Sequence, residues 1–492
     1  MTQRKSAEKE PSPQEIDMLV TLFNKKRYAE METLAREMAA RFPGHGIGWK
    51  AMGTALVQQG RNEEALVPLR KAAEFSQGDF QPYNNLGNAL LKLGRLHEAE
   101  AVYRQALELN PGFAIAHYNL GNTLQKLGRL PEAKDSLHRA LEINPGFAEA
   151  HNNLGIVLQG LGQLDDAVAS HRRALEIKPD YAEAHNSLGL TLYKLGRLDE
   201  AEASYRRAFQ AKPDYAEARY NIGNVFKEQG RLEEAAACYK SCLEIEPEDR
   251  LGARLLLASL GFEPMPPRAS EAHLEAFYIS KASTWDMELG RTQKYYGAKL
   301  VAQALKSQPN KPGKLDILDA GCGTGHVGLL VRDMASRLDG VDMSPDMLEK
   351  AKEKKVYDNI YQADLESFMQ ANPGKYDAVT CAATLIHFGD LSPAFMAAAA
   401  CLRNNGLFVF TVFPNEREQD GKEVVVAQSE GLARSGCYAH GKNYITRLAE
   451  SAGFVVEAFD TEIHEYHKDK PVMCFVVVLR QLFRLAGLRE PL

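Results

Sequence analysis

The sequence predicts two domains: an all-α superhelix of repeated helix pairs, followed by an α/β domain with a doubly wound sheet. Three observations support this division. In the first half, a pattern of glycine, alanine and proline recurs every 34 residues. In the second half, short apolar runs alternate with helical patterns, as in a parallel sheet covered by helices. The glycine-rich stretch DAGCGTG, residues 319–325, follows the first of these apolar runs.

The repeat period is carried by residues at fixed places in each unit. The alanines run from Ala65 to Ala235 and the prolines from Pro111 to Pro247, in steps of 34 residues. The glycines are Gly53, Gly87, Gly121, Gly155, Gly189 and Gly223. This order and period resemble the tetratricopeptide repeat, with six clear units from about Gly46 to Glu248. An atypical unit precedes them, where a capping repeat belongs.

Each unit is expected to form two helices. In one unit, YNNLGNALLKLG ends at Gly94 and RLHEAEAVYRQALELNP ends at Pro111. Small residues at the Gly87 and Ala99 positions allow the two helices to approach closely. Because no unit can bury its apolar face alone, stacking of the units forms the core and coils the array into a superhelix.

Asparagines recur on one face of the first helix of the units, with Ser187 interrupting the series. They are Asn85, Asn88, Asn119, Asn122, Asn153, Asn221 and Asn224. The array resembles the superhelices of O-linked N-acetylglucosamine transferases, whose inner groove holds peptide backbone on an asparagine ladder. This resemblance implies a protein or peptide partner, and an amide suits any backbone because it both donates and accepts. The alternative is that these amides bond between neighbouring helices.

Three histidines, His117, His151 and His185, also occur once per unit. They stand where other units have Trp49 and Tyr83, so an aromatic packing position explains them. Successive repeats separate the rings too widely for bonds of about 2.1 Å to one metal ion. No metal site is therefore expected.

A linker is expected after the last repeat. DRLGARLLLASLGF should form a terminal helix that covers the repeats, and EPMPPRASEAH, which follows, is rich in proline. The expected limits are 1–260 for the repeats, 261–275 for the linker, 276–482 for the second domain and 483–492 for a tail.

The second domain alternates strands and helices. Strands are expected at 315–321, 338–343, 359–365, 376–384 and 406–413, with a closing pair at 454–466 and 471–480. Helices are expected at 325–335, 344–355, 391–402 and 442–454, and the second of these has Ser344 as its cap and Pro345 in its first turn. In such a sheet, ligands bind at the carboxyl ends of the strands, where the strand order reverses.

The glycine-rich stretch ends the first strand. Glycine there lets a ligand lie against bare backbone beside a helix N-terminus. The dinucleotide fingerprint needs a sixth-position glycine where this chain has His326. The stretch is instead similar to the first motif of the class I S-adenosylmethionine-dependent methyltransferases, which implies that S-adenosyl-L-methionine binds here. The residues concerned are Asp319, Gly321, Cys322, Gly323 and Gly325.

Two more acids end the next two strands. Asp342 lies 23 residues after Asp319, where a carboxylate can accept hydrogen bonds from both ribose hydroxyls. The resemblance implies that Asp364 accepts from the adenine amino group and that Met343 and Leu365 form walls beside the ring. A helix cap or a solvated turn would explain any one acid, but three acids in register with a glycine loop favour a cofactor site.

The resemblance extends from about Ala276 to Arg480, and this chain departs from the family after the fourth strand. The family often has an acid where this chain has Thr384 and a tyrosine where it has His387. His387 is a candidate general base, since an unperturbed histidine has a pKa near 6.5; a pocket wall is the alternative. Other candidates are Tyr278, Tyr295 and Tyr296, for which lid packing is the alternative, and His440, for which a surface loop is expected.

Composition limits the function classes. A net charge of -6 argues against bulk attraction to nucleic acid or an anionic membrane. The N-terminus lacks the apolar core of a signal peptide, and no apolar run is long enough to span a bilayer. Seven cysteines without a C-x-x-C pair fit a reducing compartment. A cytoplasmic protein is therefore expected.

These features predict an S-adenosylmethionine-dependent methyltransferase whose repeats recruit a protein or another macromolecular acceptor or partner. Two alternatives stay open. One is a methyltransferase for a small molecule or glycan, with the repeats serving assembly. The other is a repeat scaffold with a non-catalytic cofactor-binding module. Intact cofactor motifs favour an enzyme, and such an enzyme needs a base only where the acceptor must lose a proton.

Overall fold

Two compact units, Met1–Asn221 and Ile222–Leu492, make up the chain in the computed structural model. The structure describes residues 10–76, 78–282, 295–308, 313–415, 418, 421–427, 437–467 and 470–482. The expected tail at 483–492 and part of the segment expected to cover the cofactor, 283–294, lie outside the described residues. None of the helices in the described part combines the length and apolar character that a membrane crossing requires.

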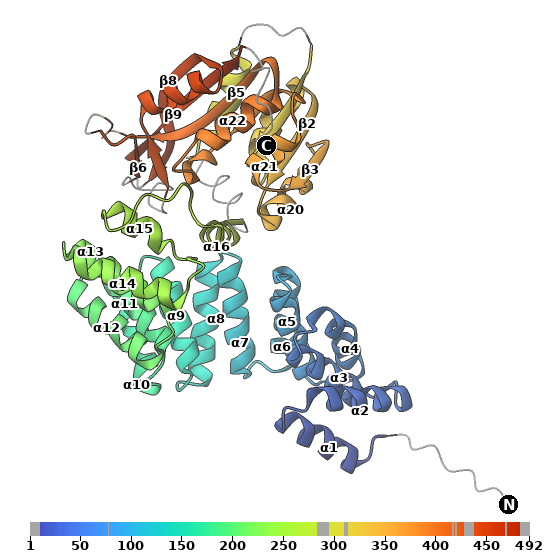
Figure 1. Cartoon of the computed structure of the whole chain (residues 1–492). Helices are drawn as coiled ribbons and strands as arrows, with labels where there is room; N and C mark the ends of the chain where they lie inside the picture. Colours follow the sequence, from blue (N-terminus) through green and yellow to red (C-terminus); the bar gives the residue numbers. More distant parts are fainter. Residues whose placement is uncertain are drawn as a thin grey trace, which may run out of the picture. The chain divides into compact units, whose positions relative to one another are not determined.

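The first unit consists of helix pairs, drawn from blue to green in Figure 1. The helices are α1 (Pro13–Asn24), α2 (Tyr28–Arg41), α3 (Gly46–Gln58), α4 (Asn62–Phe75), α5 (Gln81–Lys92), α6 (Leu96–Leu109), α7 (Ala114–Lys126), α8 (Leu130–Ile143), α9 (Ala148–Gly160), α10 (Leu164–Ile177), α11 (Ala182–Lys194), α12 (Leu198–Ala211), α13 (Ala216–Glu228) and α14 (Leu232–Ile245). The two units divide inside α13. The predicted two helices per repeat are confirmed, and α1 with α2 forms the atypical pair that precedes them. Gly94, which ends α5 as predicted, has a φ of +72°.

The recurring glycine makes the close contact inside each pair. A Cβ added at Gly87 would lie 2.5 Å from the ring of Tyr103, and one added at Gly189 would lie 2.7 Å from the ring of Tyr205. Both tyrosine rings are fully buried. A side chain larger than hydrogen would therefore force the two helices apart, which confirms the predicted close approach.

The same contact predicts a loss of stability in Gly189→Val. Its side chain would overlap the buried ring of Tyr205, and overpacking of this kind costs about 1–3 kcal/mol. Denaturant unfolding followed by far-ultraviolet circular dichroism measures the loss. Gly112→Val is the control, because a Cβ there meets only the Asn110 side chain, at 3.5 Å. Equal stability of the two variants would contradict the packing argument.

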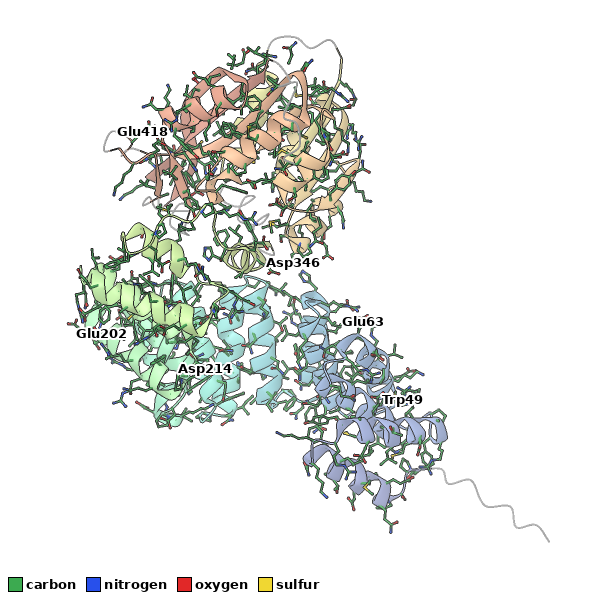
Figure 2. All side chains as sticks on the ribbon, in the orientation of Figure 1. Trp49, Glu63, Glu202, Asp214, Asp346 and Glu418 are labelled. Atoms are coloured by element: carbon green, nitrogen blue, oxygen red, sulfur yellow. The ribbon has the colours of Figure 1, made fainter. Side chains whose placement is uncertain are left out.

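The surface of the repeats is polar and charged. Trp49, Glu63, Glu202 and Asp214, which Figure 2 labels, stand on helices or turns of the first unit. Arginine and glutamate pair along the helices; Arg197 Nη2, for example, lies 2.7 Å from Glu200 Oε1. Such exposed pairs add about 1 kcal/mol or less each, so the buried helix contacts stabilise the array.

The second unit continues through two helices, α15 (Ala253–Ser259) and α16 (Glu271–Ala282), into a sheet. The strands are β1 (Leu315–Ala320), β2 (Ala335–Asp342), β3 (Asn359–Gln362), β4 (Tyr376–Cys381), β5 (Leu402–Pro414), β6 (Val424–Val426), β7 (Tyr438–His440), β8 (Phe454–His467) and β9 (Lys470–Gln481). Parallel strands run in the order β3-β2-β1-β4-β5, with β9 antiparallel to β5 and β8 antiparallel to β9. All the predicted strands are confirmed. The two strands that were not predicted, β6 and β7, are three residues each, too short to show a periodic pattern.

Helices cover both faces of this sheet. Neighbouring residues of β1 belong to different cores, since side chains alternate along a strand. Ile317 packs in the core that contains α18 (Gly297–Lys306) and α19 (His326–Val331). Leu318 packs in the core with α21 (Leu365–Ala371), α22 (Ser392–Cys401) and α23 (Lys442–Ser451). The predicted doubly wound fold is confirmed.

The predicted start of α20 (Pro345–Glu353) is confirmed in detail. The Ser344 side chain accepts a hydrogen bond from the backbone N–H of Met347, and Pro345 occupies the first turn. This cap fixes the helix directly after Asp342, the last residue of β2. The polypeptide that leaves β2 is therefore held in one conformation beside the ends of its neighbouring strands.

The proline-rich stretch expected to be a linker is hydrogen-bonded to the α/β domain. The Ala269 N–H donates to the His387 carbonyl at 3.0 Å, and the Gly389 N–H donates to the Pro267 carbonyl at 2.7 Å. The Tyr438 hydroxyl donates to the Pro266 carbonyl at 2.9 Å. The stretch thus forms a wall beside the loop that follows β4.

Candidate active site

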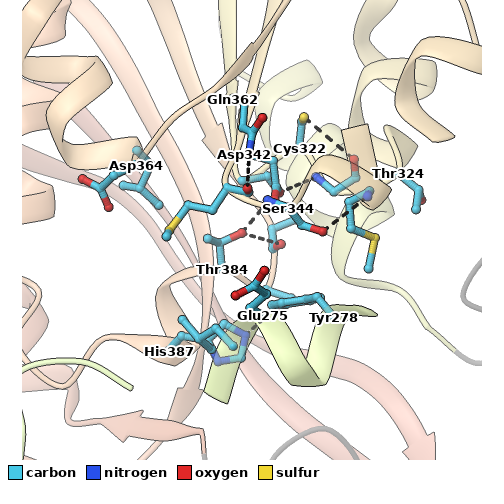
Figure 3. A pocket seen from close by; sticks show the side chains of 18 of the residues that line it. Glu275, Tyr278, Cys322, Thr324, Asp342, Ser344, Gln362, Asp364, Thr384 and His387 are labelled. Carbon is cyan, nitrogen blue, oxygen red and sulfur yellow. Dashed lines mark hydrogen bonds between the residues drawn. The ribbon is translucent and has the colours of Figure 1, made fainter. Parts of the chain in front are cut away.

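A cavity of about 340 Å³ opens at the carboxyl ends of the parallel strands, where the strand order reverses between β1 and β4. Its walls come from the loops after β1, β2, β3 and β4 and from α16 (Figure 3). This is the edge at which open α/β sheets bind ligands. Seven of the predicted cofactor residues line it: Gly321, Cys322, Gly323, Asp342, Met343, Asp364 and Leu365. The two others, Asp319 and Gly325, are not among its lining residues.

Glycine is required in the loop after β1 for two separate reasons. Gly321 has a φ of +75°, and a Cβ there would collide with the Thr384 side chain. Gly323 has a φ of +51°, and a Cβ there would meet nothing within 4 Å. Because Gly323 lines the cavity, its bare backbone is open to a ligand. Gly325, with a φ of +92°, instead caps α19.

Asp342 ties the loop after β1 to the start of α20. Its Oδ2 accepts from the Gly323 N–H and its Oδ1 accepts from the Ser344 N–H, both at 2.9 Å. Burial raises the pKa of this carboxyl, and the two backbone hydrogen bonds act against the rise. Each carboxylate oxygen can accept a further hydrogen bond, so Asp342 can receive ligand hydroxyls at the cavity wall.

Asp319 is fully buried under the loop. It accepts hydrogen bonds from the Tyr357 hydroxyl at 2.6 Å and from the Thr380 hydroxyl at 3.1 Å. Burial raises its pKa to about 6, although both hydrogen bonds favour the ionised form. Its contacts support the loop from beneath by joining β1 to β4 and to Tyr357.

Asp364 is both a helix cap and a cavity residue. Its Oδ1 accepts from the backbone N–H and the hydroxyl of Ser367, both at 3.0 Å, which caps α21. Its Oδ2 accepts from Arg268 Nη1 at 3.0 Å. Met343 is exposed and Leu365 is buried, so the two predicted wall residues differ in how far they reach the solvent.

His387 lies buried in the short 3-10 helix after β4 and faces Tyr278 of α16 (Figure 3). Its Nε2 is 2.5 Å from the Tyr278 hydroxyl oxygen, and its Nδ1 is 4.0 Å from Cys437 Sγ. Burial lowers the pKa of His387 to about 3. The expectation of a pKa near the ordinary histidine value is therefore wrong, because the buried ring resists charging.

The other candidates for a base are divided by the fold. Tyr278 and Tyr295 line the cavity, whereas Tyr296 does not; its ring lies against Tyr466. The surface position expected for His440 is wrong. It is buried in β7, between β5 and β6, its Nε2 is 2.8 Å from the Phe388 carbonyl oxygen, and burial lowers its pKa to about 4.

Several lining residues were not predicted from the sequence. Gln362 could have been found because it is the last residue of the third strand. Ala383, which follows β4, has a φ of +57° and donates its N–H to the buried Thr411 hydroxyl at 3.0 Å. Strained backbone of this kind is concentrated at functional sites, but no sequence pattern indicates it. The remaining unpredicted residues are Arg268, Glu271, Leu274, Glu275, Ala298, Thr324, His326, Val327, Ser344, Pro345, Met347, Ala363, Ala382 and Phe388.

In the repeats, the asparagine series bonds between neighbouring units. Asn119 Nδ2 donates to Asn84 Oδ1 and to Asn88 Oδ1, both at 3.0 Å. Asn153 Nδ2 donates to Asn122 Oδ1 at 2.7 Å. The alternative of bonding between helices is thus realised at these positions. The carbonyl oxygens of these half-buried amides can still accept a peptide N–H, so the peptide groove stays a prediction.

The ends of the series make contacts of the same kind. Asn85 Nδ2 donates to the Thr54 hydroxyl at 3.2 Å, and Asn221 Nδ2 donates to Asn186 Oδ1 at 3.0 Å. Asn224 Oδ1 accepts from the Tyr239 hydroxyl at 2.9 Å. These amides align neighbouring helices, whatever else they bind.

The repeated histidines share their position with Trp49, as predicted. In each case, a side-chain nitrogen lies within hydrogen-bond distance of the proline carbonyl six residues earlier: 2.9 Å for Trp49, 2.9 Å for His117, 3.1 Å for His151 and 2.8 Å for His185. These bonds account for the rings as packing residues. In the described part of the chain, no group of three His, Cys, Asp or Glu side chains could hold a metal ion.

Both halves match family models. Residues 318–410 match the model described as a methyltransferase domain. Residues 53–94 and 87–128 match the model described as a TPR repeat, and residues 112–180, 146–214 and 180–248 match the tetratricopeptide repeat model. The methyltransferase match spans β1 to β5 and therefore includes the loops that line the cavity.

Similar proteins are known for each half. The malonyl-[acyl-carrier protein] O-methyltransferase of Acetivibrio thermocellus is 32% identical over 136 residues, 26% of this chain and 48% of that protein. The ubiquinone biosynthesis O-methyltransferase of Sodalis glossinidius is 26% identical over 156 residues, 31% of this chain and 61% of that protein. The chain thus spans about half to three fifths of the length of these relatives. The crystal structure of YrrB, described as a TPR protein with an unusual peptide-binding site, is 31% identical over 37% of this chain and 93% of that chain, with a TM-score of 0.32.

Proposed function

We propose that this chain, in which tetratricopeptide repeats at residues 53–248 precede a methyltransferase domain at residues 318–410, is a class I S-adenosyl-L-methionine-dependent methyltransferase. The observation that carries the proposal is the arrangement around Asp342. Its carboxylate holds the Gly323 and Ser344 N–H groups at the rim of a cavity that Asp364 also lines. The carboxyl end of each of the first three strands thus contributes polar groups to one pocket.

The described residues fit this cofactor. The open backbone at Gly323 offers a cradle without a side chain, and Asp342 offers acceptors for hydroxyl groups. Met343 and Leu365 offer apolar contact beside Asp364. When bound, S-adenosyl-L-methionine supplies a methyl group activated on a sulfonium sulfur.

The residues of this chain then have the task of alignment. Positioning the reactants can account for about 7–11 kcal/mol of a reaction barrier. Tyr278 and His387 line the same cavity as Asp342, and their side chains are hydrogen-bonded to each other (Figure 3). His387 is neutral because burial depresses its pKa, so its ring can accept a proton from a neighbouring hydroxyl.

An oxygen acceptor is part of the proposal. The names of the relatives describe O-methyl transfer, to malonyl-[acyl-carrier protein] in one case and in ubiquinone biosynthesis in the other. A hydroxyl acceptor must lose a proton, and His387 with Tyr278 provides a route for it. We further propose that the repeats recruit a protein, or a macromolecule that carries the acceptor. The alternatives are a small-molecule or glycan acceptor and a scaffold with a non-catalytic cofactor module.

Transfer of labelled methyl groups tests the activity and the acceptor class. With S-adenosyl-L-methionine that carries a tritiated methyl group, we expect the full chain to label an acceptor in a bacterial lysate. If the repeats recruit that acceptor, the second unit alone, Ile222–Leu492, should label it about ten-fold less efficiently at low acceptor concentration. Equal labelling by this fragment would exclude recruitment by the first unit. Cofactor binding without labelling of any fraction would favour the scaffold.

The domain limits and the location belong to the same proposal. The limits are 1–260 for the repeats, 261–275 for the connection, 276–482 for the methyltransferase domain and 483–492 for the tail. A cytoplasmic location is supported by seven buried cysteine side chains, which suit a reducing compartment.

A further inference from the structure

Arg268 reaches the candidate cofactor cavity from the proline-rich stretch before α16. Its Nη1 donates to Asp364 Oδ2 at 3.0 Å, and its Nη2 donates to Glu271 Oε1 at 2.6 Å. All three side chains line the cavity, and about a third of the Arg268 side chain is exposed. The guanidinium therefore faces the space in which a ligand would contact Asp364.

Asp364 is held from both sides by these contacts. Ser367 donates two hydrogen bonds to Oδ1, while Arg268 donates to Oδ2. A carboxylate fixed at both oxygens cannot rotate freely, so its remaining acceptor positions point in set directions. Fixing a group before the ligand arrives reduces the entropy lost on binding.

The backbone around Arg268 is fixed as well. Arg268 forms an antiparallel bridge with Phe388, and the neighbouring Ala269 N–H donates to the His387 carbonyl at 3.0 Å. On the other side, the Ser270 hydroxyl donates to the Asp249 carbonyl at 2.9 Å, where the chain leaves the last repeat. Arg268 is thus held between the exit of the repeats and the loop that carries His387.

We propose that Arg268 is a positioning residue that orients Asp364 to accept a hydrogen bond from the amino group of a purine base. The proposal rests on the proposed function, since it concerns the base of the same cofactor. It also makes the connection between the repeats and the methyltransferase domain a working part of the cofactor site. A planar guanidinium suits this role because separate N–H groups can hold Asp364 and Glu271 together.

The experiment compares two ligands that differ at the amino group. S-adenosylhomocysteine carries it, whereas S-inosylhomocysteine has an oxygen at that position. The full chain should bind the adenosine form about ten- to a hundred-fold more tightly, as expected for a hydrogen bond to a charged acceptor. In Arg268→Ala this preference should fall below about three-fold. Isothermal titration calorimetry measures both affinities.

Two further variants make the result specific. Arg268→Lys keeps a charged donor for Asp364 and should recover part of the preference. Arg254→Ala is the control, because Arg254 donates to the Pro247 carbonyl at 3.3 Å and does not line the cofactor cavity. It should keep the full preference. Arg268→Lys also carries the test if Arg268→Ala does not fold.

The outcomes separate this inference from the proposed function. If the full chain binds neither ligand, the methyltransferase proposal fails. If it binds both equally, or if Arg268→Ala keeps the wild-type preference, only the role of Arg268 is overturned. Tighter binding by Arg268→Ala would also overturn it, since Arg268 would then compete with the base for Asp364.

Discussion

Asp342→Ala should weaken the binding of S-adenosyl-L-methionine about ten- to a hundred-fold. The substitution removes the carboxylate that is expected to receive the ribose hydroxyls, and hydrogen bonds to a charged group contribute about 1.5–3 kcal/mol. It also releases the Gly323 and Ser344 N–H groups that Asp342 now holds at 2.9 Å, which loosens the loop. Calorimetric titration with S-adenosyl-L-methionine and S-adenosylhomocysteine measures the change.

Asp346→Ala provides a matched control for this prediction. Asp346, labelled in Figure 2, is exposed in the first turn of α20, four residues after Asp342, and does not line the cavity. It should bind the cofactor as the wild type does. Failure of the wild type to bind either ligand, or tighter binding of NAD, would exclude the methyltransferase proposal.

His387→Gln should lower turnover by roughly a hundred-fold and leave cofactor affinity unchanged. Glutamine keeps a polar side chain beside Tyr278 but cannot take a proton from an acceptor hydroxyl, and a positioned base contributes about 10²–10⁴-fold. Initial rates at saturating cofactor, together with calorimetry, separate the two quantities. Turnover near the wild-type value would assign His387 to the wall of the acceptor site and leave catalysis to alignment.

The pH dependence follows from the lowered pKa of His387. Because burial places this pKa at about 3, the ring stays neutral through the working range, and no acid limb near pH 6.5 is expected from it. Stability shows the opposite side of the same shift. The unfolded histidine binds a proton near pH 6.5 while the folded one does not, so the contribution of His387 to stability falls as the pH decreases below that value. An acid limb near pH 6.5 that is lost in His387→Gln would contradict the buried, neutral ring.

The repeat architecture could be predicted from the sequence because it depends on contacts between residues close in the chain. Gly189 and Tyr205 are 16 residues apart, and the same pair of positions recurs in every unit. A local contact repeated at one period produces a readable pattern. The same holds for the loop after β1, where the glycines with positive φ and the strand before them are consecutive.

Other features of the site depend on contacts that no local pattern records. Arg268 meets Asp364 across 96 residues, and Tyr278 meets His387 across 109 residues. The pKa values of His387 and His440 depend on burial, which is set by the packing of β4, β5 and β7 rather than by neighbours in the chain. An ordinary pKa and a surface loop were accordingly the wrong expectations for these two residues.

The sequence alone thus determined the repeats, the order of the strands along the chain and the glycine loop, since each is carried by residues within a few turns of one another. Only the tertiary structure decided which acids line the cavity and which support it. Asp342 and Asp364 reach the cavity, whereas Asp319, in the same motif as Gly321, turns beneath the loop toward Tyr357 and Thr380. The physical reason is that burial and hydrogen-bond partners arise when distant segments pack together, and the pattern within one segment does not specify its neighbours in space.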